Sequence, residues 1–177
     1  DYEFEIYGQL VDGDTGALLG SPIRISQMGP DGSINYGAWT PAVAYNSTKN
    51  EFLVVWYGED DTAPLVDNEQ EIFGQLLNAS TGALVGGNFR ISDMGPNGST
   101  LYDAADPDVV YNSLQDEYLV VWSGDDNTSP LVDNEQEIFG QLLTASTGAE
   151  TGANDFCLSD MGPDGNAGYD ALHPAVT

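Results

Sequence analysis

The chain contains almost no basic residues. Its 177 residues include 3 Lys and Arg against 29 Asp and Glu, which gives a formal net charge of −26 at pH 7. Phosphate binding needs clustered cations, so nucleic acid is excluded as a partner and an anionic membrane surface is disfavoured. Like charges at this density oppose compaction unless salt or bound cations offset them.

Cysteine and long apolar runs are also scarce. Cys157 is the single cysteine, which excludes an internal disulfide. No hydrophobic run approaches the length that spans a bilayer, so no membrane insertion is predicted. Low Cys and Lys with abundant Asp, Asn, Gly and Thr is typical of an extracellular or cell-surface protein. The chain is nevertheless 41% hydrophobic, with 3 Trp, 9 Tyr and 6 Phe, which is enough to build a core.

An internal repeat sets the predicted organisation. The hexapeptide EIYGQL begins at Glu5, and EIFGQL begins at Glu71 and again at Glu137, a spacing of 66 residues each time. The chain is therefore predicted to be one repeat array of about 2.7 units. The units are a partial unit at 1–40, full units at 41–106 and 107–173, and the start of a further unit at 174–177.

Each unit reads as four strands. In the second unit they are PAVAYN, EFLVVW, EIFGQLL and FRIS, which are rich in β-branched and aromatic residues and are bounded by turn residues. EFLVVW is apolar on both faces, so its sheet should be covered on both sides. This pattern predicts an all-β fold of four-stranded antiparallel sheets arranged as propeller-like blades. A β-sandwich or a linear stack of sheets is the alternative.

The pattern VVYNS…EYLVVW…EIFGQLL…FRIS resembles the tandem β-propeller blade repeats of large secreted or surface bacterial proteins. The resemblance extends over every unit and implies a fold, but no particular function. The chain starts at a third strand and stops at a first strand, so we expect that it does not close into a ring alone. It would complete its sheets with the rest of a longer chain or by self-association.

Each repeat departs from that family pattern by two acidic insertions, of which the first links the second and third strands. GEDDTAPLVDNEQE (58–71) and GDDNTSPLVDNEQE (124–137) place carboxylates at alternate positions, as a hard cation such as calcium requires. A solvated acidic loop is the alternative, because the spacing of an EF-hand is absent. The predicted calcium ligands are Asp60, Asp61, Asp67, Glu69 and Glu71, then Asp125, Asp126, Asp133, Glu135 and Glu137, and finally Asp1, Glu3 and Glu5.

A second recurring segment links one unit to the next. It contains Met-Gly-Pro-Asp/Asn-Gly, in which Pro presets φ and Gly accepts a positive φ, so a tight turn is predicted. Met28, Met94 and Met161 are expected to fill the space between sheets. Asp93, Asp103, Asp160 and Asp170 are candidates for a further cation site.

The repetition of the acidic residues argues against an enzyme. Catalytic carboxylate pairs, as in glycoside hydrolysis, need two unequal environments, whereas these recur identically. The sequence favours a non-enzymatic extracellular scaffold, stabilised by calcium and assembled through sheet edges or neighbouring chains into a surface layer, appendage or filament. The alternative is a carbohydrate-binding propeller module, a lectin or an accessory domain of a secreted enzyme. Such a module would hold polysaccharide through exposed Trp and Tyr.

Overall fold

The computed structural model describes residues 3–60, 62–126, 128–163 and 165–177. Within these ranges the chain forms ten strands and no helix, so the predicted all-β class is confirmed. No described element is therefore a helix that could span a membrane. The strands are β1 (Tyr7–Val11), β2 (Leu18–Arg24), β3 (Ala38–Asn46), β4 (Glu51–Glu59), β5 (Gln70–Asn78), β6 (Leu84–Arg90), β7 (Ala104–Asn112), β8 (Glu117–Asp125), β9 (Gln136–Thr144) and β10 (Glu150–Cys157).

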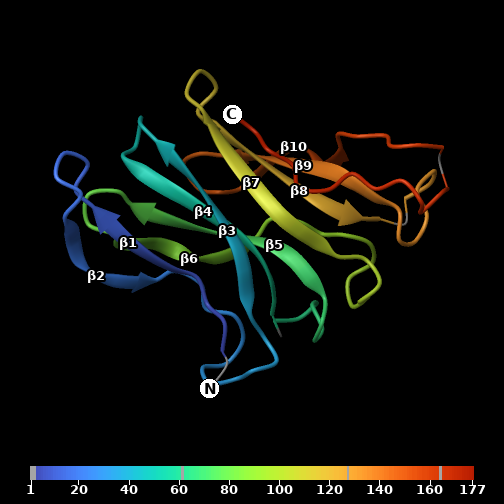
Figure 1. Cartoon of the computed structure of the whole chain (residues 1–177), viewed down its shortest axis with the longest axis horizontal. Coiled ribbons are helices and arrows are strands. Elements are labelled where there is room, and N and C mark those ends of the chain that lie inside the picture. The colour runs from blue at the N-terminus through green and yellow to red at the C-terminus, as the bar shows by residue number, and fades with distance from the viewer. Residues whose placement is uncertain (1–2, 61, 127, 164) are drawn as a thin grey trace.

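The strands form three antiparallel sheets in chain order, as Figure 1 shows. β3-β4-β5-β6 and β7-β8-β9-β10 are four-stranded meanders, and β1-β2 is a two-stranded sheet that corresponds to the last two strands of a unit. The first three predicted strands of the second unit fall within β3, β4 and β5. In the described residues the three sheets do not close into a ring (Figure 1).

The fourth strand of the second unit begins earlier than predicted. The sequence indicated 89–92, whereas β6 spans Leu84–Arg90 and pairs with β5 through a register shift between Gly74 and Leu76. The buried Gln75 side chain bridges this shift, because its Nε2 donates to the carbonyls of Leu76 (2.9 Å) and Val85 (3.0 Å). Gln9 and Gln141 make the equivalent bonds in the other units. The invariant Gln of the hexapeptide therefore replaces lost ladder bonds.

The middle sheet is buried on both faces. Trp56 and Phe73 belong to the apolar cluster that faces the β1-β2 sheet. Leu53 and Val55, on the other face of the same sheet, belong to the cluster that includes Trp122 of the third sheet. As expected from its sequence, β4 therefore presents apolar side chains to two neighbouring layers.

The segments between units pack as the sequence predicted in two of three cases. Met28 and Met94 are each 1% exposed and belong to the two apolar clusters, whereas Met161 is 47% exposed. Each of the first two is followed by a glycine at positive φ, Gly29 and Gly95, against which a tyrosine ring lies closely. A side chain at either glycine would collide with that ring.

Candidate functional site

The third position of each glutamate-rich stretch lies inside the protein. The Glu71 side chain is buried, and it accepts hydrogen bonds from the backbone N–H of Met94 (3.1 Å) and from the Ser92 hydroxyl. Ser92 Oγ in turn accepts the backbone N–H of Ile72 at 2.7 Å. Glu71 therefore ties the start of β5 to the segment that leads into the next unit.

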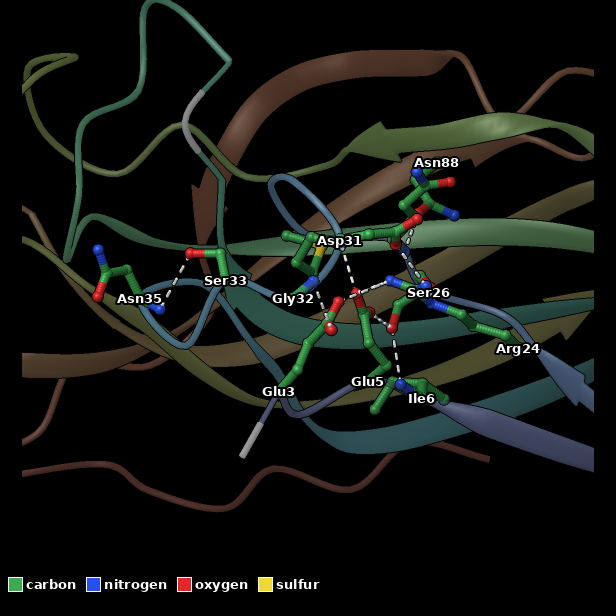
Figure 2. A network of polar contacts seen from close by, with 12 residues as sticks. Glu3, Glu5, Ile6, Arg24, Ser26, Asp31, Gly32, Ser33, Asn35 and Asn88 are labelled. Carbon is green, nitrogen blue, oxygen red and sulfur yellow. Dashed lines mark hydrogen bonds and ion pairs between the residues drawn. The ribbon is translucent and has the colours of Figure 1, made fainter. Parts of the chain in front are cut away.

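The same arrangement recurs in the other two units. Glu5 accepts the N–H of Met28 at 2.9 Å and the hydroxyl of Ser26 (Figure 2). Glu137 accepts the N–H of Met161 at 2.6 Å and the hydroxyl of Ser159. Three carboxylates 66 residues apart therefore have one structural role.

The preceding glutamate holds the turn of the linking segment. Glu69, also buried, accepts the N–H of Val66 (2.9 Å) and of Gly98 (3.0 Å), which sits at φ +84° in the Pro-Asn-Gly turn. Glu3 accepts the N–H of Gly32 at 2.8 Å, as Figure 2 shows, and Glu135 accepts that of Gly165 at 3.1 Å. We call each pair (Glu3 and Glu5, Glu69 and Glu71, Glu135 and Glu137) a glutamate clamp.

Two of the three basic residues lie at these clamps. Arg24 contacts Glu5 at 2.6 Å, Glu3 at 3.0 Å and Asp31 at 2.6 Å (Figure 2). Arg90 lies 3.9 Å from Glu71 and 3.2 Å from Asp93. The scarce positive charge is therefore placed where carboxylates are buried, since a buried charge without a partner is costly.

Burial also changes the protonation of the middle clamp. It raises the pKa of Glu71 to about 8, against the opposing effects of the Ser92 hydroxyl, the Arg90 charge and the Met94 N–H. A carboxyl group in this position binds a proton near neutral pH, which couples the clamp to pH.

The aspartates predicted as calcium ligands have different surroundings. Asp67 and Asp133 are exposed, Asp60 and Asp126 are half-buried, and Asp1 and Asp61 lie outside the described residues. In the part of the chain that the structure describes, no group of three or more His, Cys, Asp or Glu side chains is arranged to hold a metal ion. Calcium binding by these segments stays a prediction.

Asp125, at the end of β8, is a predicted ligand with a buried oxygen that has no hydrogen-bond donor. It is 4% exposed; Oδ2 accepts the N–H of Asn134 at 2.7 Å, while Oδ1 is buried and has no hydrogen-bond donor. Burial raises the pKa of Asp125 to about 6, helped by the charges of Asp133, Asp103 and Asp126. Three neighbouring carboxylates therefore concentrate negative charge around the unsatisfied oxygen of Asp125.

Sequence reasoning missed Asp155 of β10. In the preceding unit Asn88 accepts the N–H of Gln27 (2.7 Å) and donates Nδ2 to the carbonyl of Ile25 (3.0 Å). Asp155 likewise accepts the N–H of Asp93 at 2.9 Å, but its Oδ1 is buried without a donor. The one-residue insertion in TGAETGANDF hid this Asn-to-Asp exchange; aligning on Phe89 and Phe156 reveals it.

Asp155 borders a pocket of about 720 Å³ between the second linking segment and the third sheet, lined also by Asp93, Asp126, Phe139 and Cys157. Burial raises the pKa of Asp155 to about 7, and the charges of Glu150 and Asp93 add to the effect. The pocket combines acidic groups with an apolar floor.

No protein-family model matches this chain, and no curated protein matches it. The case for a function therefore rests on the repeated geometry itself.

Proposed function

We propose that this chain is a non-enzymatic structural repeat module of an extracellular or cell-surface protein. Its four-stranded sheets act as propeller-like blades, which stack face to face and join neighbouring segments or chains into a surface layer, appendage or filament. The observation that carries the proposal is the identical use of the glutamate clamp in three units. Each clamp satisfies backbone N–H groups of a linking segment, which is a structural task.

The two ends of the stack support assembly. Tyr7 is 62% exposed, whereas its counterparts Phe73 and Phe139 are 4% and 2% exposed. At the opposite end Met161 is 47% exposed, against 1% for Met94. Positions that are buried between sheets inside the stack are thus open at its ends, and exposed apolar surface of this kind favours association.

Calcium at the acidic segments is part of the proposal. Asp125 would be the first ligand, because its buried Oδ1 has no hydrogen-bond donor. Asp126 and Asp133 would have to turn toward the ion on binding, since these side chains are not arranged to hold a metal in the described structure. Asp60 and Asp67 would serve the equivalent segment of the second unit, beside the buried Glu59. A bound cation would offset the local repulsion and stabilise the segment's conformation.

Light scattering and thermal unfolding of the full chain, with calcium or with a chelator, test this proposal. We expect calcium to raise both the mass of the assembly and the unfolding temperature, and chelation to reverse both changes. The double variant Asp125→Asn with Asp133→Asn should lose the response, while Asp14→Asn, an exposed turn residue, should keep it. A monomer that is indifferent to calcium at every concentration would contradict the proposal.

A carbohydrate-binding module remains the second candidate, and one aromatic group favours it. Trp39 stacks on Tyr57 with ring centroids 5.5 Å apart, and Phe4, 53% exposed, lies 6.3 Å from Trp39. Rows of aromatic rings can bind sugar faces. Polysaccharide binding that is lost in Trp39→Ala, by a chain that stays monomeric, would favour this function over the scaffold.

A further inference from the structure

The outer edge of β1 has no strand partner among the described residues. β1 pairs with β2 alone, and the Ile6 carbonyl points to that side because it accepts the N–H of Ile25 at 2.8 Å. Alternation along a strand then directs the backbone N–H and C=O groups of Tyr7, Gln9 and Val11 to the opposite edge. An unpaired edge of this kind is a template for a further strand.

The repeat shows which strand pairs with this edge elsewhere. β5 and β9 contain EIFGQL, β1 contains the last four residues of the related EIYGQL, and β5 and β9 each pair with the strand before them, β4 or β8. In β5, Phe73 lies opposite Trp56 and Leu77 lies opposite Phe52. The equivalents of Phe73 and Leu77 in β1 are Tyr7 and Val11, which are 62% and 52% exposed.

A groove runs beside the open edge. It has a volume of about 490 Å³, with β1 residues on one side and Val43, Phe52 and Val54 of the second sheet among its lining. Its lining is mainly apolar and contains no charged side chain. Figure 1 shows β1 lying beside the sheet that carries β3 and β4.

The equivalent surface of the third sheet is covered. Val43 is 60% exposed, but its counterpart Val109 is 5% exposed, and Tyr118, the counterpart of Phe52, is fully buried. Val109 and Tyr118 share an apolar cluster with Ala44 of β3 and Leu53 of β4. On the third sheet, the β3-β4 hairpin of the preceding unit therefore covers the surface around Val109 and Tyr118.

We propose that the groove binds an antiparallel two-stranded hairpin with the sequence pattern of residues 38–59, supplied by another polypeptide segment that carries this repeat. Its second strand adds to β1 in the register of β4 on β5, which places the Trp56-type side chain opposite Tyr7. Its first strand lies over Val43. This inference rests on the proposed function, since it names the partner through which the scaffold would extend.

Both the backbone edge and the apolar floor contribute to this binding. The edge supplies main-chain hydrogen bonds with fixed register, as in other cases of strand addition. The apolar surface of the second sheet selects apolar residues at alternate positions of the incoming strand, like Leu53 and Val55 of β4, which face the third sheet in the same way. A polar or charged strand could hydrogen-bond to the backbone of β1, but it could not pack on the apolar side chains of the groove.

The test adds a synthetic peptide of residues 38–59 to the full chain and follows amide hydrogen exchange residue by residue. We expect exchange at Tyr7, Gln9 and Val11 to slow at least tenfold, with saturation at one peptide per chain. A peptide carrying Val55→Asp should not protect these amides, because Val55 lies on the face of β4 that packs on the following sheet. In the protein, Val43→Asp should weaken binding at least tenfold without unfolding, because this side chain is 60% exposed. Leu114→Asp, at a position 89% exposed in a distant turn, is the matched control and should bind normally.

Two results would overturn the inference: no protection at the edge, or equal binding by Val43→Asp. The peptide titration is run at a protein concentration at which the chain alone is monomeric, so that only the added hairpin can cover the groove. The scaffold proposal is judged separately by calcium-dependent assembly. Assembly without peptide binding would reject only the hairpin, and peptide binding by a chain that never assembles would reject only the scaffold.

Discussion

The carboxylate of Glu71, at the start of β5, accepts the backbone N–H of Met94 at 3.1 Å, across 23 residues of sequence. The bond joins a strand of one sheet to the segment that enters the next sheet. Because Glu5 and Glu137 make the equivalent bonds, each unit holds the backbone of the segment that leads into the next unit. The order of the sheets therefore depends on buried acidic groups as well as on apolar contact.

Replacing the clamp residue should destabilise the fold. Glu71→Ala leaves the Met94 N–H and the Ser92 hydroxyl without their acceptor, at an expected cost of about 1–3 kcal/mol. Glu71→Gln retains one acceptor oxygen and should cost less. Urea unfolding measures both, with Asp14→Ala at an exposed turn as the control. Equal stability of Glu71→Ala and the parent chain would show that the clamp contributes nothing.

Stability should fall as the pH rises from mildly acidic to mildly alkaline. Burial raises the pKa of Glu71 to about 8, of Asp155 to about 7 and of Asp125 to about 6, each above the ordinary value near 4. At a pH between the ordinary and the raised pKa of each group, the folded chain binds more protons than the unfolded chain. The stabilisation from these groups is thus present below about pH 4 and is lost progressively up to about pH 8. Urea midpoints measured at intervals between these pH values test the trend, and a midpoint that rises with pH would refute it.

Exchanging Asp155 for the residue at the equivalent position should stabilise the chain at alkaline pH. Asn88 donates to the carbonyls of Ile25 (3.0 Å) and of the Gln75 side chain (2.7 Å), whereas Asp155 Oδ1 has no donor. We expect Asp155→Asn to gain about 1–2 kcal/mol at pH 8 and little at pH 5, where the carboxyl group is protonated. Thermal unfolding at the two pH values measures the difference. The reciprocal Asn88→Asp should lose stability at pH 8, and a gain there would contradict this reading.

Two glycines of one linking segment should differ in their tolerance of alanine. Gly98 has φ +84°, and a Cβ there would meet only the Val66 side chain at 3.9 Å, an ordinary contact, so Gly98→Ala adds backbone strain of about 1 kcal/mol. Gly95 has φ +63°, and a Cβ there would also overlap the ring of Tyr102. Gly95→Ala should therefore be the more damaging change in a chemical unfolding series. Equal costs would mean that the tyrosine ring moves aside freely.

The strands were predictable because alternation and the repeat are local signals. β4 and β5 could be placed from EFLVVW and EIFGQLL alone, since both are bounded by turn residues. The extent of β6 could not be predicted, because only FRIS showed a strand pattern, whereas the buried side chain of Gln75 sustains the pairing across the irregularity before it.

The partners of the glutamates were hidden for a different reason. Glu69 and Glu71 were grouped as calcium ligands on their spacing, yet their donors are backbone N–H groups of Gly98 and Met94 in the following segment. A backbone donor leaves no mark in the sequence, so these hydrogen bonds could not be predicted, and calcium binding by Glu69 and Glu71 stays a prediction. Asp125 could be named from the sequence, but its unsatisfied oxygen required the structure.

The face-to-face order of the sheets also affects how such a gene can evolve. The middle sheet packs against one neighbouring sheet on each of its two faces, so a single unit carries both surfaces that its neighbours require. Unequal recombination that duplicates or deletes 66 codons would therefore yield a longer or shorter chain with its internal contacts intact, and no new complementary surface would have to arise by point mutation.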